Sequence, residues 1–429
     1  MQGAAAGDTG EAGADGARFH GSLSALGWIA LKGSVLMLAT LGLYRFWYLT
    51  DLRRHYWGET ESAGATLEYA GTGRELFIGF LVALIVVLPL NVALFIAALS
   101  TGLITEIWGV GAFLVLGFLG QYALFRARRY RLTRTVFRGL RFHQTGSAWG
   151  YAVRASLWWA AILATLGLAY PFARASLERY KLGHTWFGDL QARFEGRGRT
   201  FFARGIWLWL AGAGPLVAAL AFLAATVTWP ELASALERVG EEGDLSDLLG
   251  REGSAAVGLA FMALVWGAVF TVLAFPLFHG IEFRWWAGGV RFGRLAAVSS
   301  LRNRSIYGAW LVYILGLQAL AVGLAVAAGV VVAVLAILVT VMGGDIAEWG
   351  QEAATWDWLV LGMAIGGYAV AGLGAAAVYQ LAVVRRLWLL KWRTLSLAGL
   401  DQLESVRARG EASSAFGEGL ADALDAGGI

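Results

Sequence analysis

Long apolar stretches without alternation most constrain what this chain can fold into. Six of them reach the roughly 20 residues that a helix needs to cross the hydrocarbon core of a bilayer. They are Glu75–Ser100, Ile104–Phe125, Arg204–Thr228, Ser254–Phe278, Tyr307–Met342 and Trp356–Val384. Strands of a membrane barrel alternate apolar and polar residues, which these stretches do not. The sequence therefore predicts an all-α polytopic membrane protein.

The composition agrees with this class. Of the 429 residues, 58% are hydrophobic and only 15% are charged, whereas soluble domains carry about 25% charged residues. Cysteine is absent, which excludes disulfides, thiolate metal sites and cysteine nucleophiles. The pI near 9.4 reflects positive charge in the loops, and orientation in a bilayer explains that charge without a nucleic-acid partner.

Both ends of the sequence differ from its apolar middle. Residues 1–17 are rich in Gly and Ala and lack the basic start and apolar core of a secretory signal. Residues 405–429 are small, acidic and rich in Gly. We expect both segments to be disordered tails.

An internal repeat organises the chain. Residues 40–77 and 165–202 align without a gap, with 12 identities in 38 positions. Both contain Thr-Leu-Gly-Leu, a basic aromatic segment, a Gly-x-Thr and a Gly-x-Gly-Arg. A weaker third copy begins at residue 290 and ends with KWRTLSLAG at 391–399. We therefore expect three related membrane units, at residues 18–140, 141–289 and 290–404, of which the last is degenerate.

The distribution of charge predicts which loops face the cytoplasm. Lys and Arg dominate residues 126–148, 174–204, 280–306 and 385–409, and acidic residues dominate 229–254 and 341–355. Because Lys and Arg in short loops mark the cytoplasmic side, we expect the four basic segments inside and the two acidic ones outside.

Two further apolar segments, Leu26–Leu49 and Trp149–Phe172, run through the Thr-Leu-Gly-Leu sites. If Trp149–Phe172 crossed fully, its basic flanks would lie on opposite sides of the membrane, so we expect both segments to be re-entrant or interfacial. Lys32 and Arg154 within them fit a shallow position, because a cation at the bilayer centre costs at least ~2.5 kcal/mol. The prediction is six full transmembrane helices, two re-entrant or interfacial segments and two cytoplasmic termini, with the units as parallel repeats. Eight simple spans are the alternative.

The repeated motifs resemble those of the YjgN family of bacterial inner-membrane proteins, a domain of unknown function. The resemblance rests on TLGLYRFW, LRRHYWGET, YAGTGRELFIGF and RRLWLLKWRTLSLAG, and it covers nearly the whole chain after the first tail. The second copy departs from the pattern at three positions, where Ala169, Tyr170 and Pro171 replace Tyr44, Arg45 and Phe46. The resemblance implies the inner membrane of a Gram-negative bacterium and implies no activity.

Clustered arginines provide candidate contacts for an anion or a lipid head group. Arg presents a bidentate fork, aromatic residues favour the membrane interface, and a Gly-x-Gly-Arg before a helix can cradle an anion. The candidates are Arg45, Arg53, Arg54, Trp57, Arg74, Arg179 and Arg199. The alternative is an interfacial anchor with flexible entries to the helices, since neither Gly-x-Gly-Arg matches a P-loop.

Polar residues within the spans are candidates for a permeation pathway. They are Asn91, Gln121 and Gln318, and interhelical hydrogen bonding is the alternative role. Acids are nearly absent from the spans, which argues against cation coupling. No metal-binding or catalytic pattern occurs at convincing spacing, so we predict no enzyme, no cofactor and no nucleic-acid partner. The expected partners are membrane lipids, a second copy of the chain and an unidentified small molecule.

Two functions remain. The leading hypothesis is permeation of a small neutral or anionic solute, because non-spanning helices at membrane depth are tolerated where they line a cavity or are buried in protein. The rival is a structural or lipid-interacting scaffold, in which these helices lie flat and the Arg and Trp clusters hold anionic head groups.

Overall fold

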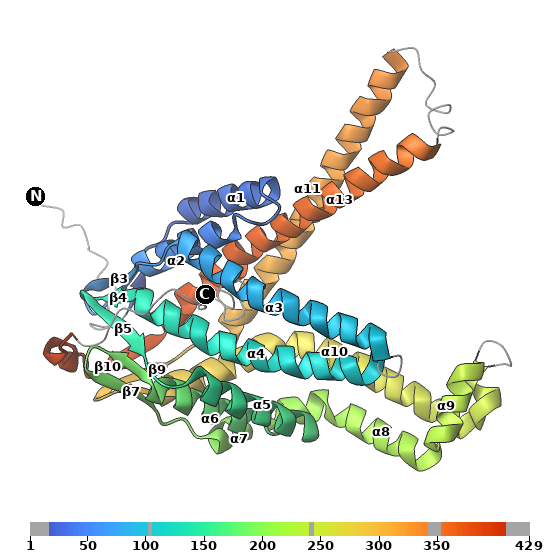
Figure 1. The fold of residues 1–429 in the computed structure, drawn as a ribbon, viewed down its shortest axis with the longest axis horizontal. Coiled ribbons are helices and arrows are strands. Elements are labelled where there is room, and N and C mark those ends of the chain that lie inside the picture. Colours follow the sequence, from blue (N-terminus) through green and yellow to red (C-terminus); the bar gives the residue numbers. More distant parts are fainter. Residues whose placement is uncertain (1–16, 102–104, 240–243, 342–352, 409–429) are drawn as a thin grey trace, which may run out of the picture.

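The computed structural model describes residues 17–101, 105–239, 244–341 and 353–408, and shows a mostly helical protein with one sheet at one end (Figure 1). The two expected disordered tails lie almost entirely outside these ranges. The described helices are α1 (Leu23–Ala39), α2 (Arg45–Gly58), α3 (Gly73–Thr101), α4 (Thr105–Arg134), α5 (Ala148–Ala164), α6 (Tyr170–Gly183), α7 (Gly198–Gly212), α8 (Gly214–Thr226), α9 (Trp229–Arg238), α10 (Leu245–Gly289), α11 (Asn303–Val341), α13 (Ala353–Tyr379) and α14 (Arg385–Arg393), with a π-helical turn η1 (Gln380–Val384) and a 3₁₀ turn η2 (Leu400–Ser405).

The strands are β1 (Arg18–Phe19), β2 (Thr60–Ser62), β3 (Ala65–Tyr69), β4 (Thr135–Phe137), β5 (Leu140–Gln144), β6 (Thr185–Phe187), β7 (Leu190–Phe194), β8 (Val290–Phe292), β9 (Leu295–Ser299) and β10 (Leu395–Ala398). They form one antiparallel sheet in which each strand pairs with the next in sequence, so β1 and β10 are its edges. The all-α prediction is therefore wrong. The strands are only two to five residues long. They are too short to show a clear alternation of polar and apolar residues, and the much longer apolar stretches dominate the sequence pattern.

Four hairpins of one design make up most of the sheet. Each has a three-residue strand, a two-residue turn and a five-residue strand. Both turn residues have positive φ in Ala63–Gly64 and Arg138–Gly139, whereas Gly188 and Gly293 have positive φ at the first turn position of the other two hairpins. These patterns fit type I′ and II′ turns, whose twist matches that of the strands.

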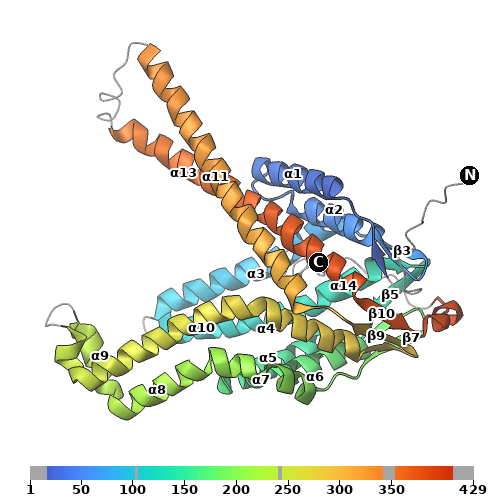
Figure 2. The same cartoon turned by 180° about the vertical axis from the view of Figure 1, so that it is seen from behind.

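Helices leave the sheet between successive hairpins and return to it, mostly as pairs, whereas between β7 and β8 the four helices α7, α8, α9 and α10 follow one another. Most helices contact the next one along the chain, α8 packs on α10, and α13 contacts α1. The far ends of α11 and α13 project away from the other helices (Figures 1 and 2). Arg385 of α14 donates to the carbonyl of Gly21 over 3.1 Å, and Trp388 donates to the hydroxyl of Thr60 over 2.9 Å. The predicted unit boundary at residue 140 falls at the start of β5, and the division into three units stays a prediction.

The two Thr-Leu-Gly-Leu segments build identical turns, one between α1 and α2 and one between α5 and α6. Leu41 and Gly42 have φ of 50° and 90°. The hydroxyl of Thr40 donates to the carbonyl of Leu36 over 2.6 Å and accepts from the amide of Tyr44 over 3.0 Å. The turn at Thr165 repeats these bonds. Each pair is thus a short helical hairpin with both ends at the sheet.

Several other helices are suited to a membrane. Among the residues that the structure describes, four helices are long and apolar enough to cross one, and α7 with α8, bent by 50°, makes a fifth if the pair is counted as one span. They are Gly73–Ala93, Ser246–Gly289, Asn303–Leu338, Leu361–Arg393 and the pair Gly198–Gly212 with Gly214–Thr226. The remaining expected span, Ile104–Phe125, falls in α4 and begins outside the described residues. Exposed apolar side chains cover these helices, Ile85 (73%) and Val272 (73%) among them.

Candidate functional site

The predicted arginine and aromatic cluster of α2 packs largely inside the protein. Arg53 has no exposed surface, and its Nη1 donates to the hydroxyl of Tyr69 over 3.3 Å. Trp57 donates from Nε1 to the hydroxyl of Thr135 over 3.1 Å, and its ring lies 5.4 Å from that of Trp388. Arg53 and Trp57 therefore connect α2 to neighbouring parts of the fold, which is a structural role.

The other predicted arginines lie near the sheet end of the helices. Arg54 is exposed and donates from Nη2 to the carbonyl of Gly71 over 2.9 Å. Arg45 is half-buried at the start of α2. Arg74, Arg179 and Arg199 are exposed, and their side chains make no hydrogen bond or ion pair with other residues that the structure describes. The structure does not gather these arginines around one cavity.

The Gly-x-Gly-Arg segments form tight corners between a strand and a helix. A Cβ on Gly71 would lie 2.6 Å from the ring of Tyr69, and a Cβ on Gly73 would lie 2.8 Å from the Cα of Trp47. The equivalent glycines of the second copy meet the equivalent neighbours, at 2.4 and 3.0 Å. Close packing therefore explains the glycines of both segments.

The three predicted pathway residues lie on three different helices. Asn91 of α3 donates from Nδ2 to the carbonyl of Val87 in its own helix over 2.8 Å. Gln121 is half-buried on α4, and Gln318 is exposed on α11. None of them lines the three cavities described below. Their role in a pathway stays a prediction.

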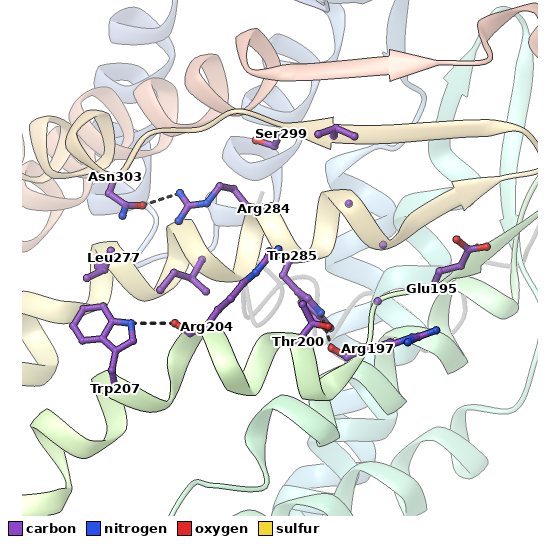
Figure 3. Close-up of a pocket in the computed structure, with 15 residues that line it drawn as sticks. Glu195, Arg197, Thr200, Arg204, Trp207, Leu277, Arg284, Trp285, Ser299 and Asn303 are labelled. Carbon is purple, nitrogen blue, oxygen red and sulfur yellow. Dashed lines mark hydrogen bonds between the residues drawn. The ribbon is translucent and has the colours of Figure 1, made fainter.

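A cavity of about 810 Å³, the arginine cavity, lies where the second Gly-x-Gly-Arg segment meets α10 and the start of α11 (Figure 3). Its charged lining consists of Arg197, Arg204, Arg284 and Glu195. The Nη1 of Arg284 donates to the carbonyl of Leu301 and to Oδ1 of Asn303, both over 2.7 Å. Both acceptors are neutral, so the positive charge of Arg284 is not neutralised by them.

A network of buried ion pairs joins α6 to α10 near the sheet. Arg174 bridges two carboxylates, with its Nη1 3.2 Å from Oε1 of Glu178 and its Nε 2.6 Å from Oε1 of Glu282. The side chains of Glu178 and Glu282 are only 5% and 11% exposed. Glu178 also accepts from Lys181 over 2.5 Å and from Trp286 over 3.2 Å.

Charge stabilises the ionised form of Glu178. Burial alone raises the pKa of this carboxyl, but the charges of Lys181, Arg174 and Arg128 outweigh burial and lower the pKa to about 2. Burial lowers the pKa of the Lys181 ammonium to about 8, against the opposing effect of Glu178. The carboxylate is therefore a fixed negative charge at neutral pH, and it organises the cations around it.

Two more cavities meet at Glu282. The apolar cavity, about 810 Å³, lies between the turn of the α5–α6 hairpin, α7 and α10, and its lining is mostly aliphatic and aromatic. The polar cavity, about 580 Å³, lies between α6, α10, α11 and α14, and its lining includes Arg174, Lys391 and Trp388. Phe275, His279 and Glu282 line both cavities, so the two spaces adjoin.

Lys391 is the available cation of the polar cavity. Its side chain is exposed, and its Nζ lies 5.3 Å from the centre of the Phe283 ring. Within the part of the chain that the structure describes, no carboxylate lies within ion-pair distance of it. It can therefore contact an anionic group that enters the cavity.

Sequence reasoning missed the residues of these cavities. Glu282 lies just beyond the apolar stretch Ser254–Phe278, in a segment that the sequence predicts to be a loop. The signal that was available is the spacing of Arg174, Glu178 and Lys181, because residues three and four apart share one face of a helix. No group of three or more His, Cys, Asp or Glu that could hold a metal occurs among the described residues.

The fold and its cavities place the chain in the class of mostly helical membrane proteins. Its helices are joined at one end by an antiparallel sheet. The chain belongs to a family of bacterial proteins of unknown function (DUF898), whose family model matches residues 15–423. This match confirms the resemblance to the YjgN family. No curated protein and no solved structure matches the chain.

Proposed function

We propose that this protein is a multi-pass protein of the bacterial inner membrane that takes an anionic amphiphile from the bilayer into its adjoining apolar and polar cavities. The observation that carries the proposal is the sharing of Phe275, His279 and Glu282 by these two cavities. An apolar space continuous with a cationic one fits a molecule with an apolar chain and a charged head. The proposal narrows the solute of the permeation hypothesis to an amphiphile.

The topology of the proposal has six crossings, with α1–α2 and α5–α6 as re-entrant hairpins and both termini cytoplasmic. The sheet is built mainly from the basic segments of the sequence, whereas the acidic α9 lies far from the sheet (Figure 1). The positive-inside rule then favours a cytoplasmic sheet. Helices of 17 residues, such as α1 and α5, extend about 25 Å, less than the roughly 30 Å of a hydrocarbon core.

The short α5–α6 hairpin provides an entrance from the bilayer. Its turn residues Gly167 and Leu168 line the apolar cavity, and its tip exposes Leu163 (68%) and Leu166 (62%). Since this hairpin ends within the membrane, lipid chains reach the space beside its tip between α7 and α10. Volumes of 300–1,000 Å³ are typical of ligand pockets, and each cavity lies in that range.

Cysteine labelling tests the topology, because the native chain has no cysteine. Single cysteines at Gly58 and Gly183 should be protected from a membrane-impermeant thiol reagent in intact cells, and a cysteine at Ser246 should react. Labelling of Gly183→Cys from outside the cell would overturn the same-side placement of the α5–α6 hairpin.

Photo-crosslinking tests the cavities. The probe is a long-chain fatty acid with a diazirine in its chain, added to the purified protein in nanodiscs, and crosslinked peptides are mapped by mass spectrometry. We expect crosslinks on α7 and α10 around the apolar cavity. Lys391→Gln should weaken capture about tenfold, because a hydrogen bond to a charged group contributes about 1.5–3 kcal/mol. Arg386→Gln is the matched control, since Arg386 is exposed on the same helix and outside the cavities.

A filled cavity should also block capture. Ala274 lines the apolar cavity, so Ala274→Trp should abolish crosslinking there, while Ala255→Trp at an exposed site on the same helix should not. Crosslinks spread over the outer helix faces, insensitive to both cavity substitutions, would refute the proposal. They would favour the rival function, a scaffold that contacts lipid only at its surface.

A further inference from the structure

We propose that the arginine cavity is a second, separate site, which binds the phosphate group of an anionic phospholipid in the cytoplasmic leaflet. The inference rests on the membrane placement of the proposed function but is independent of the apolar and polar cavities. The occupant is a lipid head group, and its function there is to fix the protein to anionic lipid.

The cavity carries an excess of positive charge. Three guanidinium groups line it, from Arg197, Arg204 and Arg284, against one carboxylate, Glu195. The side chain of Glu195 is 64% exposed and lies 3.4 Å from the Nε of Arg291. Its charge is therefore paired with Arg291, and the three cavity arginines have no carboxylate partner among the residues that the structure describes.

The arrangement of donors suits a phosphate. Arg204 rises from α7 toward α10, where Arg284 is held in place by Asn303 (Figure 3). Two hydroxyl-bearing residues, Thr200 and Ser299, also line the cavity. Two arginines that face one space from opposite helices repel one another unless an anion lies between them, and guanidinium forks match phosphate oxygens bidentately.

One side of the cavity is apolar, which distinguishes a lipid from a soluble anion. Leu277 and Ile281 of α10 line it together with Trp207 of α7. Trp207 is 49% exposed, and its Nε1 donates to the carbonyl of Arg204 over 3.1 Å. Trp is favoured at the head-group level of membranes, so a phosphate between the arginines would have its acyl chains along these apolar side chains.

The repeat provides an internal comparison. In the first copy, Thr72 occupies the position of Arg197, and if the alignment is continued without a gap beyond residue 202, Gly79 and Val82 occupy those of Arg204 and Trp207. The corner between strand and helix is nevertheless the same in both copies. The arginines and the Trp are therefore not required to build the corner, and a ligand explains their presence in the second copy.

The decisive experiment compares lipids on the purified protein in detergent. Thermal stability is measured with added phosphatidylglycerol, phosphatidylcholine or inorganic phosphate. We expect phosphatidylglycerol to raise the melting temperature in a saturable way and the other two to have little effect. Equal stabilisation by inorganic phosphate would overturn the lipid assignment, and equal stabilisation by phosphatidylcholine would overturn the anion site.

A double variant, Arg197→Gln with Arg204→Gln, tests the residues. Neither side chain makes a hydrogen bond or ion pair with other described residues, so the fold should persist without them. Apparent affinity for phosphatidylglycerol should fall about tenfold for each guanidinium removed. The control, Arg74→Gln with Arg179→Gln, makes the same change in charge at exposed sites outside the cavity. Equal losses in both double variants would refute the site.

Lys391→Gln separates this site from the proposed function. It alters the polar cavity and leaves the arginine cavity intact. Stabilisation by phosphatidylglycerol should therefore be unchanged in Lys391→Gln. A loss there equal to that of the double variant would mean that phosphatidylglycerol acts through the polar cavity, which would overturn a separate site.

Discussion

Replacing Glu178 by Gln should destabilise the protein more than any surface charge substitution of the same kind. The side chain of Glu178 is 5% exposed and pairs with Arg174 and Lys181 over 3.2 and 2.5 Å. Removing one partner of a buried ion pair costs about 3–5 kcal/mol, because the remaining charges stay buried without compensation. Gln keeps the size of the side chain and can still accept from Trp286, so the loss of charge is isolated.

The free energy converts into a measurable shift. An unfolding entropy of about 2 cal/mol/K per residue over 429 residues makes each kcal/mol worth about 1 °C, so we expect a decrease of about 3–5 °C. The assay is the intrinsic tryptophan fluorescence of the purified protein in detergent, heated at a fixed rate. The control is Asp51→Asn, whose partner Lys32 lies 3.5 Å away with 45% of its side chain exposed, and such pairs contribute about 0–1 kcal/mol. A decrease for Glu178→Gln no larger than that of Asp51→Asn would refute the reasoning.

Three further predictions follow from the same contacts. Because the pKa of Glu178 is lowered from 4.5 to about 2, its contribution to stability is complete above the unfolded value and is lost as pH falls toward 2. Acidification should therefore reduce the melting temperature of the native protein more than that of Glu178→Gln. Gly73→Ala should cost about 1–3 kcal/mol through overpacking, whereas Gly58→Ala, with nothing within 4 Å of the added Cβ, should be neutral or stabilising on thermal unfolding. Thr40→Val and Thr165→Val each remove two hydrogen bonds of a turn and should each cost about 1–2 kcal/mol in the same assay, while equal melting temperatures would contradict the capping role.

The length of the apolar stretches and their lack of alternation predicted the helices from the sequence, and the distribution of charge predicted which segments share a side of the membrane. The long apolar stretches appear as α3, α7 with α8, α10, α11 and α13. The sheet was not accessible in this way, because a hairpin such as β6–β7 spans only Thr185–Phe194 and its strands contain both polar and apolar residues without a long pattern. Four recurrences of a glycine turn between two short strands were the signal that could have revealed it.

The cavities were harder to predict, because they depend on distant segments. Glu282 and Arg174 are 108 residues apart, and Trp207 shares a cavity with Asn303 only because α7 and α11 flank the end of α10. The arginines chosen from the sequence belong to local motifs. In this protein those motifs mostly form tight connections between a strand and a helix. The residues that line each cavity come from segments far apart in the chain, and no single window of sequence contains such a set.

The order of strands in the sheet, which follows the sequence, determines an order in which the parts of this protein can fold. Each strand pairs only with its neighbours in the sequence, so the hairpins and the helices between them can dock one after another as the chain emerges from the ribosome. The contacts of α13 with α1 and of Trp388 with Thr60 are the exception, since Trp388 and Thr60 are 328 residues apart. These contacts therefore form last, and a nascent chain that stops before α13 leaves α1 and α2 without their contacts to the C-terminal helices.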